Sequence, residues 1–230
     1  EILLLHYLKT GGMPEVVEEE NDEFLRRYFQ DAIFERIIYR DIPLGFPVRD
    51  PILLHRLFLI ISSRPGMLVD YTELAGDLKR DRRTIETYLS YLRYSFLVFT
   101  LYNFSKNLLA SEKKKKKFYP FLPSFSWVVN PRILEEYGIL VENLIVRNSR
   151  FFYRDSQKRE VDCVFTDRGV CPVEIKMGGT IKKKEISGLL AFMKKFQVEE
   201  AIVITKDKEG EEKINGKTIK FIPLFEYLLK

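Results

Sequence analysis

The fold is decided by residues 160–176, which read EVDCVF (160–165), TDRG (166–169) and VCPVEIK (170–176). The outer two stretches are apolar runs of strand length, and the middle one supplies turn residues, so the sequence predicts a β-hairpin. Side chains alternate between the faces of a strand, which places Glu174 and Lys176 on one face and Val173 and Ile175 on the other. An apolar strand that carries two charges needs a partner, a metal or a chemical role for them.

The spacing of Asp162, Glu174 and Lys176 is suited to metal-assisted hydrolysis of a phosphodiester. Carboxylates on adjacent strands are hard oxygen ligands for Mg²⁺ or Mn²⁺, and such an ion polarises a phosphoryl group and activates water. The lysine would orient that water or neutralise charge on the phosphoryl oxygens. The alternative is an ordinary ion pair at a strand end, because Glu-x-Lys tripeptides are common.

A helix with one buried stripe is predicted at residues 133–148, because its apolar residues recur at helical spacing. Glu142 lies within this helix, and a strand at 151–154 leads from it into the hairpin. A second helix at 186–196 and a strand at 201–205 follow. Glu142 is therefore a candidate third acidic residue of the metal site. Its alternative role is that of a charge on a solvated helix face.

The middle of the chain predicts a helix-turn-helix. Helices are expected at 52–61, 72–78 and 82–93, with Tyr71 or Thr72 as the cap of the second and a turn at 79–81. Strands at 95–102 and 118–119 would then form a β-wing around a lysine run. As a recognition helix, 82–93 would present four residues to DNA, namely Arg82, Arg83, Thr84 and Thr87. Winged helices also serve protein contacts, which is the alternative.

The total charge of the chain favours nucleic-acid binding only mildly. Its 38 Lys and Arg residues against 33 Asp and Glu residues give a net charge of +5 and a pI near 9.0. Two local runs are stronger candidates for phosphate contacts: Lys113, Lys114, Lys115, Lys116 and Lys117, and also Lys182, Lys183 and Lys184. The alternative is that both runs are solvated surface, with 113–117 a disordered loop.

Several other features of the sequence limit the classes of function that the chain could have. No apolar run of membrane-spanning length and no basic leader occur, so a soluble, cytoplasmic protein without a membrane partner is expected. The cysteines, Cys163 and Cys171, are predicted to be buried, reduced thiols on the face opposite to the acids. The histidines, His6 and His55, lie in apolar helical surroundings far from each other in sequence and are interpreted as packing or surface residues, so no Ser-His-Asp or Cys-His arrangement is expected. Five aromatic residues at 118–127 predict a hydrophobic linker between two domains rather than a stacking surface for bases.

The predicted order of helix, three strands, helix and strand resembles the PD-(D/E)xK, or restriction-endonuclease-like, nuclease fold. In that family the first helix often contributes an acidic residue, a role that Glu142 matches by position. The segment YLKTGGMPEV (7–16), with LVENL (140–144), EVD (160–162) and VEIK (173–176), extends the resemblance over nearly the whole chain. It is similar to the C-terminal half of a large group of archaeal and bacterial AAA-like P-loop ATPases.

This resemblance implies that an ATPase domain precedes the Gly-Gly-x-Pro-Glu segment and is missing from this chain, which starts without a methionine. No G-x-x-x-x-G-K-[ST] motif occurs, so ATP is not expected to bind this fragment. The group usually has Lys-x-Tyr-x-x-Asp before its last domain. This chain has FYPFL (118–122) there, so that connection is expected to pack differently.

We therefore predict an α+β chain with a helical winged-helix unit at 1–120 and a restriction-endonuclease-like αβββαβ domain at 121–230. The expected function is that of the DNA-binding, metal-dependent nuclease part of an ATPase. The alternative is a catalytically silent nuclease fold that serves as a DNA- or protein-interaction or regulatory module of the ATPase. The sequence leaves open the kind of nucleic acid and the oligomeric state.

Overall fold

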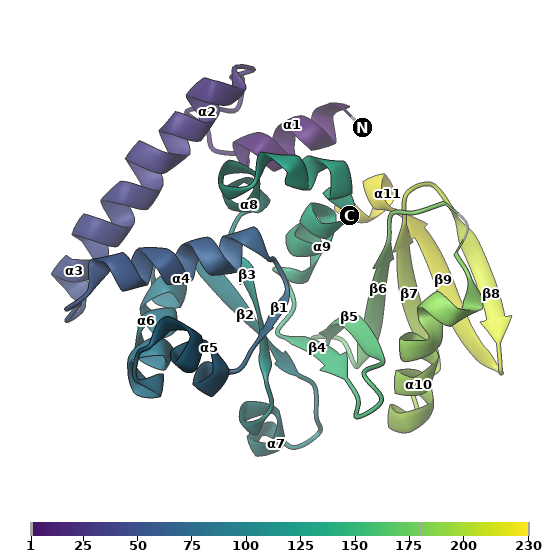
Figure 1. Cartoon of the computed structure of the whole chain (residues 1–230). Coiled ribbons are helices and arrows are strands. Elements are labelled where there is room, and N and C mark those ends of the chain that lie inside the picture. Colours follow the sequence, from purple (N-terminus) through teal and green to yellow (C-terminus); the bar gives the residue numbers. More distant parts are fainter. Residues whose placement is uncertain (1, 180, 230) are drawn as a thin grey trace. The chain divides into compact units, whose positions relative to one another are not determined.

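The computed structural model describes residues 2–179 and 181–229, apart from the side chain of Lys183 (Figure 1). The chain divides into two compact units: unit 1 comprises Glu1–Thr100 and Lys115–Leu144, and unit 2 comprises Leu101–Lys114 and Ile145–Lys230. Both units mix helices and strands, as an α+β chain requires. The division differs from the predicted boundary after residue 120, because residues 121–144 fold with unit 1 and residues 101–114 fold with unit 2.

Helices dominate the N-terminal part of unit 1. The chain passes from α2 into two π-helical stretches and α3 without leaving helical geometry, which gives the long rod in Figure 1. Asn21 caps the start of this rod by accepting the backbone N–H groups of Glu23 and Phe24. The bounds are α1 (Ile2–Thr10), α2 (Asp22–Tyr28), η1 (Phe29–Glu35), η2 (Ile37–Asp41), α3 (Ile42–Gly45) and α4 (Pro51–Ser63).

The predicted helix-turn-helix is present as two helices, α5 (Tyr71–Leu78) and α6 (Arg82–Tyr94). Asp70, rather than Tyr71 or Thr72, caps α5, and Asp81 caps α6. The buried residues of α6 are the predicted ones, Ile85, Tyr88, Leu89 and Leu92. Strands β1 (Met67–Val69), β2 (Val98–Asn103) and β3 (Lys116–Pro120) accompany them, and β1 pairs antiparallel with β3.

The aromatic segment at 118–127 belongs to the core of unit 1, so the prediction of an interdomain linker is wrong. It forms β3 and α8 (Pro123–Val129), and its residues Tyr119, Phe125 and Trp127 are each at most 2% exposed. The Phe125 ring meets Phe34 edge to face at 5.2 Å between centroids, and it meets Phe29 and Phe58 in the same way. These contacts join residues far apart in sequence, which explains why 121–144 folds with unit 1.

The predicted helix at 133–148 begins later and ends earlier than expected. A 3₁₀ helix, η3 (Pro131–Glu136), precedes α9 (Tyr137–Val146). Pro131 supplies no backbone N–H and suits the first position of such a turn. Of residues 140–146, Glu142 alone is not buried, so α9 has more than the single buried stripe that was predicted.

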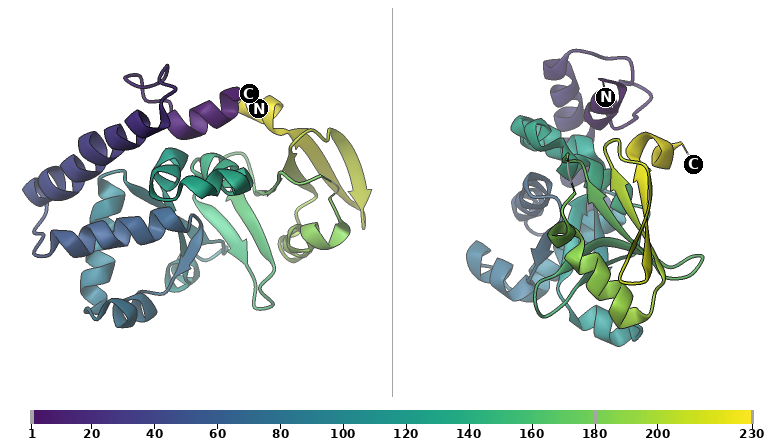
Figure 2. Two further views of the ribbon diagram at one scale, coloured as in Figure 1. Left: turned by 45° about the horizontal axis from the view of Figure 1, so that its top comes forward. Right: turned by 90° about the vertical axis from the view of Figure 1, so that its right-hand side faces the viewer.

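Unit 2 contains a mixed sheet in the order β4-β5-β6-β7-β9-β8, labelled in Figure 1 and seen from two further directions in Figure 2. The hairpin of β5 and β6 is antiparallel, as predicted, whereas β6, β7 and β9 run parallel. The charged segment at 206–217 contains strand β8. The bounds are β4 (Phe151–Arg154), β5 (Glu160–Phe165), β6 (Cys171–Lys176), β7 (Glu200–Thr205), β8 (Gly210–Ile214) and β9 (Lys217–Pro223).

Three helices and a 3₁₀ turn complete unit 2, namely α7 (Leu108–Lys113), η4 (Lys183–Ile186), α10 (Ser187–Phe196) and α11 (Leu224–Leu228). The core forms where α10 lies against the sheet: its Leu189, Phe192 and Met193 cluster with Val203 of β7 and with Phe221 of β9. In the part of the chain that the structure describes, no helix has the length and apolar character needed to cross a membrane.

Candidate functional site

A β-bulge positions Asp162. Phe151 pairs with Val164 and Tyr153 with Val161, so β5 advances three residues while β4 advances two. The extra residue falls at Asp162 or Cys163. On the other side of β5 the recorded pairing with β6 ends at Cys163, which lies opposite Val173. Beyond that pair a side chain makes the next bond between the two strands: Asp162 Oδ2 accepts the backbone N–H of Ile175 at 2.7 Å. One bond thus fixes Asp162 to the strand that carries Glu174.

Glu174 and Lys176 lie side by side on β6, as predicted from the alternation of the strand. Glu174 is only 5% exposed, and its Oε1 accepts a bond from Lys176 Nζ at 2.6 Å. Glu174 is in register with Val203 of β7, whose side chain packs in the α10 cluster, so both charges emerge on the α10 face. A charge-assisted bond of this length offsets part of the cost of burying the carboxylate.

The cysteines are free thiols with unequal burial: Cys163 is buried, as predicted, and Cys171 only partly so. Burial raises the pKa of the nearby Tyr227 to about 12, with the two thiols adding to the effect. Burial, followed by the charge of Glu200, also raises the pKa of the Cys171 thiol. A thiol of raised pKa is a poor nucleophile, which argues against cysteine chemistry at this site.

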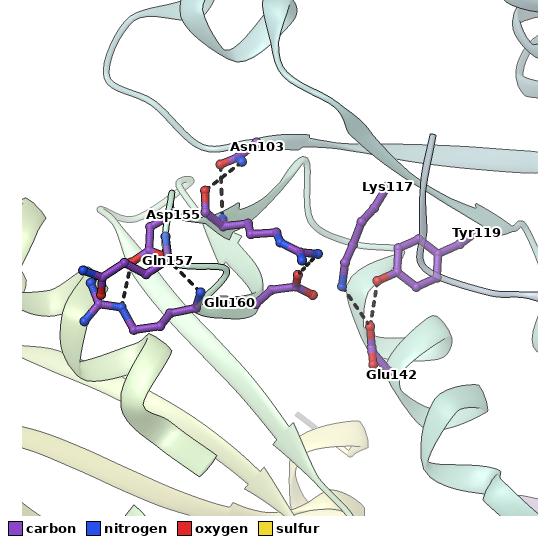
Figure 3. A network of polar contacts seen from close by, with 9 residues as sticks. Asn103, Lys117, Tyr119, Glu142, Asp155, Gln157 and Glu160 are labelled. Carbon is purple, nitrogen blue, oxygen red and sulfur yellow. Dashed lines mark hydrogen bonds and ion pairs between the residues drawn. The ribbon is translucent and has the colours of Figure 1, made fainter. Parts of the chain in front are cut away.

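Glu142 is held by two residues of unit 1 rather than by solvent (Figure 3). Tyr119 Oη donates to Glu142 Oε1 at 2.7 Å, and Lys117 Nζ lies 3.6 Å from the same oxygen. Lys117 is 5% exposed and Tyr119 is fully buried. The solvated helix face considered for Glu142 is therefore wrong. Within the described residues, no group of three or more His, Cys, Asp and Glu side chains could hold a metal ion.

A polar network around the β4–β5 turn, which was not predicted from the sequence, supports the strand that carries Asp162 (Figure 3). Asp155 accepts the backbone N–H groups of Gln157 and Arg159, both at 2.9 Å, and pairs with the Arg159 side chain. Burial raises the pKa of Asp155, but the Arg159 bonds outweigh it and leave that pKa lowered. Arg154 binds Glu160 at 3.3 Å. The sequence pattern that could have predicted this network is an aspartate, Asp155, four residues before an arginine, Arg159.

The candidate DNA-reading residues lie at the N-terminal end of α6. Arg82 and Arg83 are exposed, and Thr84 and Thr87 are partly exposed. Asp81 accepts the Thr84 backbone N–H at 3.1 Å, so this end of the helix is fixed by its cap. The two arginines are therefore presented on a rigid element.

The five-lysine run is ordered, so the disordered loop considered for it is wrong. Lys113 ends α7 and Lys114 follows it, both exposed, whereas Lys116 and Lys117 belong to β3. Lys115 pairs with Asp70 at 3.2 Å and with Glu73 at 3.6 Å, and Lys117 is the buried partner of Glu142. In the second run Lys182 and Lys184 are exposed, and the Lys183 side chain lies outside the described residues.

Comparison with known proteins gives two family matches and one relative. The model described as "Domain of unknown function (DUF8612)" matches residues 2–121, and "Domain of unknown function (DUF4143)" matches residues 137–227. The uncharacterized protein MJ1544 of Methanocaldococcus jannaschii is 25% identical over 98% of this chain and 55% of its own length. The chain thus spans about half of that relative. No solved structure matches.

Proposed function

The chain belongs to the family described as "Domain of unknown function (DUF8612)", and we propose that it is the DNA-binding, metal-dependent nuclease part of a P-loop ATPase. The observation that carries the proposal is the β5–β6 hairpin. It holds Asp162 against the Ile175 amide and presents Glu174 with Lys176 on the next strand. The ATPase domain is proposed on the resemblance of residues 7–16, 140–144, 160–162 and 173–176 to such proteins.

The two carboxylates of the hairpin fit a magnesium ion by their chemistry. Mg²⁺ prefers oxygen ligands, keeps several waters and binds proteins through one or two carboxylates plus substrate phosphate. Asp162 and Glu174 supply two carboxylates from adjacent strands. A bound ion would polarise the phosphoryl group and lower the pKa of its water. Glu142 remains a proposed third ligand, and it would have to exchange its bonds with Tyr119 and Lys117 to serve.

The side chains of the hairpin have separate roles in this proposal. The Ile175 amide orients the Asp162 carboxylate, so that one of its oxygens is fixed in direction. Lys176 balances the charge of Glu174 and, being one quarter exposed, reaches toward solvent, where a phosphate would lie. The burial of Glu174 lowers the local dielectric and strengthens each of these charge interactions.

Contact with DNA is proposed for unit 1. The helix pair α5 and α6, preceded by α4 and β1 and followed by β2, α7 and β3, supports the proposal of a winged helix. Arg82 and Arg83 at the start of α6 would enter the major groove, where a bidentate arginine discriminates guanine. In unit 2, the exposed Lys113, Lys114, Lys182 and Lys184 would contact phosphates without reading sequence.

A second candidate function is that of a silent nuclease fold, used to contact DNA or protein and to regulate the ATPase. One observation favours it: Asp162 and Lys176 both use hydrogen-bonding atoms within the hairpin itself. Such bonds stabilise a scaffold whether or not a metal binds. Metal affinity separates the two functions.

Titration calorimetry with Mn²⁺ tests the proposal directly. We expect one site in the wild type and a loss of binding by at least about tenfold in Asp162→Asn and in Glu174→Gln, because each removes a charged ligand. Glu200→Gln is the matched control, since Glu200 is an exposed strand glutamate paired with Lys220 at 2.6 Å. Equal Mn²⁺ affinity in all four proteins would favour the silent fold.

The phosphate contacts predict a salt effect that depends on position in the lysine run. Replacing Lys113 and Lys114 with serine should flatten the log–log salt dependence of DNA binding by up to about one unit per lost contact. Lys115→Ser should change the slope less, because Lys115 is already paired with Asp70 and Glu73. Anisotropy titrations with one duplex at several salt concentrations measure the slopes. Equal slopes in every variant would assign the run to spectator surface.

A further inference from the structure

A series of nearly parallel aromatic rings lies along one side of α6 in unit 1. Tyr88, Tyr91 and Tyr94 recur every three residues, and Phe46, which follows α3, lies between the last two. The centroid of the Phe46 ring is 4.5 Å from that of Tyr91 at an interplanar angle of 22°, and 6.1 Å from that of Tyr94 at 20°. Tyr88 and Tyr91 are 5.9 Å apart at 29°. We call these four rings the α6 ring stack.

The α6 ring stack differs from the aromatic core of the same unit. The rings around Phe125 meet edge to face, at angles between 71° and 89°. Stacked pairs also occur inside unit 1, where Phe99 and Tyr119 lie 5.2 Å apart at 10°, so what distinguishes the α6 ring stack is the exposure of one end. That end is Tyr94, which is 63% exposed, while Tyr88 at the other end is only 5% exposed.

The buried end of the stack is anchored by hydrogen bonds. Tyr88 Oη accepts the backbone N–H groups of Arg49 at 3.0 Å and of Asp50 at 2.9 Å. Asp50 in turn caps α4 and pairs with Arg80 at 3.0 Å. The stack is thus held on a rigid base, so a flat ligand at Tyr94 would find a surface that needs no rearrangement.

One positive charge lies at the exposed end. The Arg93 guanidinium lies 5.7 Å from the centroid of the Tyr94 ring. Arg82 and Arg83 lie in the first turn of α6, at the opposite end of the helix, so Arg93 is the arginine of α6 that lies beside Tyr94. A ligand that combines a flat aromatic face with a negative charge complements this surface better than an apolar helix of a protein partner would.

We propose that the α6 ring stack binds an unpaired base of single-stranded DNA, with the base on Tyr94 and its phosphate near Arg93. This inference rests on the proposed DNA-binding function and names its substrate as DNA that contains a single-stranded segment. A paired base has no free face to offer, so duplex DNA would not use the stack. Stacking on tyrosine tolerates any base, so the contact adds affinity without sequence preference.

Fluorescence anisotropy in EDTA, which removes metal-dependent cleavage, tests this inference. The probes are a labelled oligothymidine of about twenty nucleotides and a duplex of equal length. Tyr94→Ala should raise the dissociation constant for the single strand by about tenfold and leave duplex binding within twofold. The salt dependence of single-strand binding should be the same in Tyr94→Ala as in the wild type, because the substitution removes no charge.

Two variants control the experiment. Tyr94→Phe keeps the ring and should bind like the wild type, and Phe24→Ala removes another aromatic residue of unit 1, 53% exposed on α2, and should have no effect. Single-strand affinity that is unchanged in Tyr94→Ala, or a loss shared equally by the duplex, would overturn the inference. A wild type that binds no single strand would overturn it as well. Cleavage by the same preparations reports the nuclease proposal separately, since it depends on Asp162.

Discussion

Cleavage of DNA in the presence of Mg²⁺ or Mn²⁺ should fall by at least about 10³-fold when Lys176 is replaced by alanine. Lys176 Nζ lies 2.6 Å from Glu174 Oε1, and Glu174 is 5% exposed. Removing the ammonium group takes away both the charge that balances this buried carboxylate and the group proposed to neutralise the phosphoryl oxygens. A 10³-fold loss corresponds to about 4 kcal/mol of transition-state stabilisation.

Asp162→Ala should abolish cleavage to the same extent, because it removes a proposed metal ligand and frees the Ile175 amide. Nicking of supercoiled plasmid, followed over time with enzyme in excess, measures both losses. Lys220→Ala is the matched control: Lys220 pairs with Glu200 at 2.6 Å on neighbouring strands, in an exposed setting. This control should cleave at the wild-type rate. Equal activity in the wild type, Lys176→Ala and Asp162→Ala would identify a contaminating nuclease and end the proposal.

The hairpin could be predicted from sequence because its signal is local. The alternation of apolar residues, a turn ending in Gly169 and the Glu-x-Lys spacing all lie within one segment, and Gly169 does adopt a positive φ of 103°. The buried stripe of α6 was predicted for the same reason, since helical spacing assigns its inner face without reference to other elements.

The bulge at Asp162 could not be predicted in this way. It is defined by the register between β5 and β4, two strands whose pairing the sequence of β5 alone does not specify. Strand β8 was not predicted from the sequence, for a different reason. Its residues are charged and mostly exposed, which is typical of an edge strand, and its pairing with β9 supplies the order that its own sequence does not.

Long-range contacts account for the remaining differences. Both partners of Glu142 lie in β3. Tyr119 is 23 residues away from Glu142 in sequence, and Lys117 lies two positions before Tyr119. No helical periodicity reports such partners, so Glu142 was expected to face solvent or metal. The segment that contains Phe125 likewise joins unit 1 through rings of the N-terminal helices. The β5–β6 hairpin and the neighbouring positions of Glu174 and Lys176 could thus be predicted from sequence, whereas the contacts that distant segments make could not.

Gly188→Ala should be the most destabilising small substitution in unit 2. A Cβ atom at Gly188 would overlap the carbonyl oxygen of Glu160 and would lie 2.8 Å from the backbone C and N atoms of that residue. The obstacle is backbone rather than a flexible side chain, so either α10 or β5 must move. We expect a loss of about 3 kcal/mol or more in the free energy of unfolding.

Gly76→Ala is the matched control, because Gly76 also lies within a helix, α5, and a Cβ there meets nothing within 4 Å. This change should stabilise unit 1 by up to about 1 kcal/mol through helix propensity. Hydrogen exchange followed by mass spectrometry resolves the two units peptide by peptide. Gly188→Ala should lower protection in the peptides of α10 and β5, and Gly76→Ala should not.

The same substitution tests whether the fold positions the site. Glu160 precedes Asp162 by two residues on β5, so a displacement of Glu160 shifts the bulge and weakens the bond from the Ile175 amide to Asp162. At a temperature where Gly188→Ala remains folded, we expect cleavage to fall by at least about tenfold while Mn²⁺ affinity also drops. Full cleavage in a folded Gly188→Ala protein would show that α10 does not set the geometry of Asp162. The close approach of α10 at Gly188 would then serve the stability of unit 2 alone.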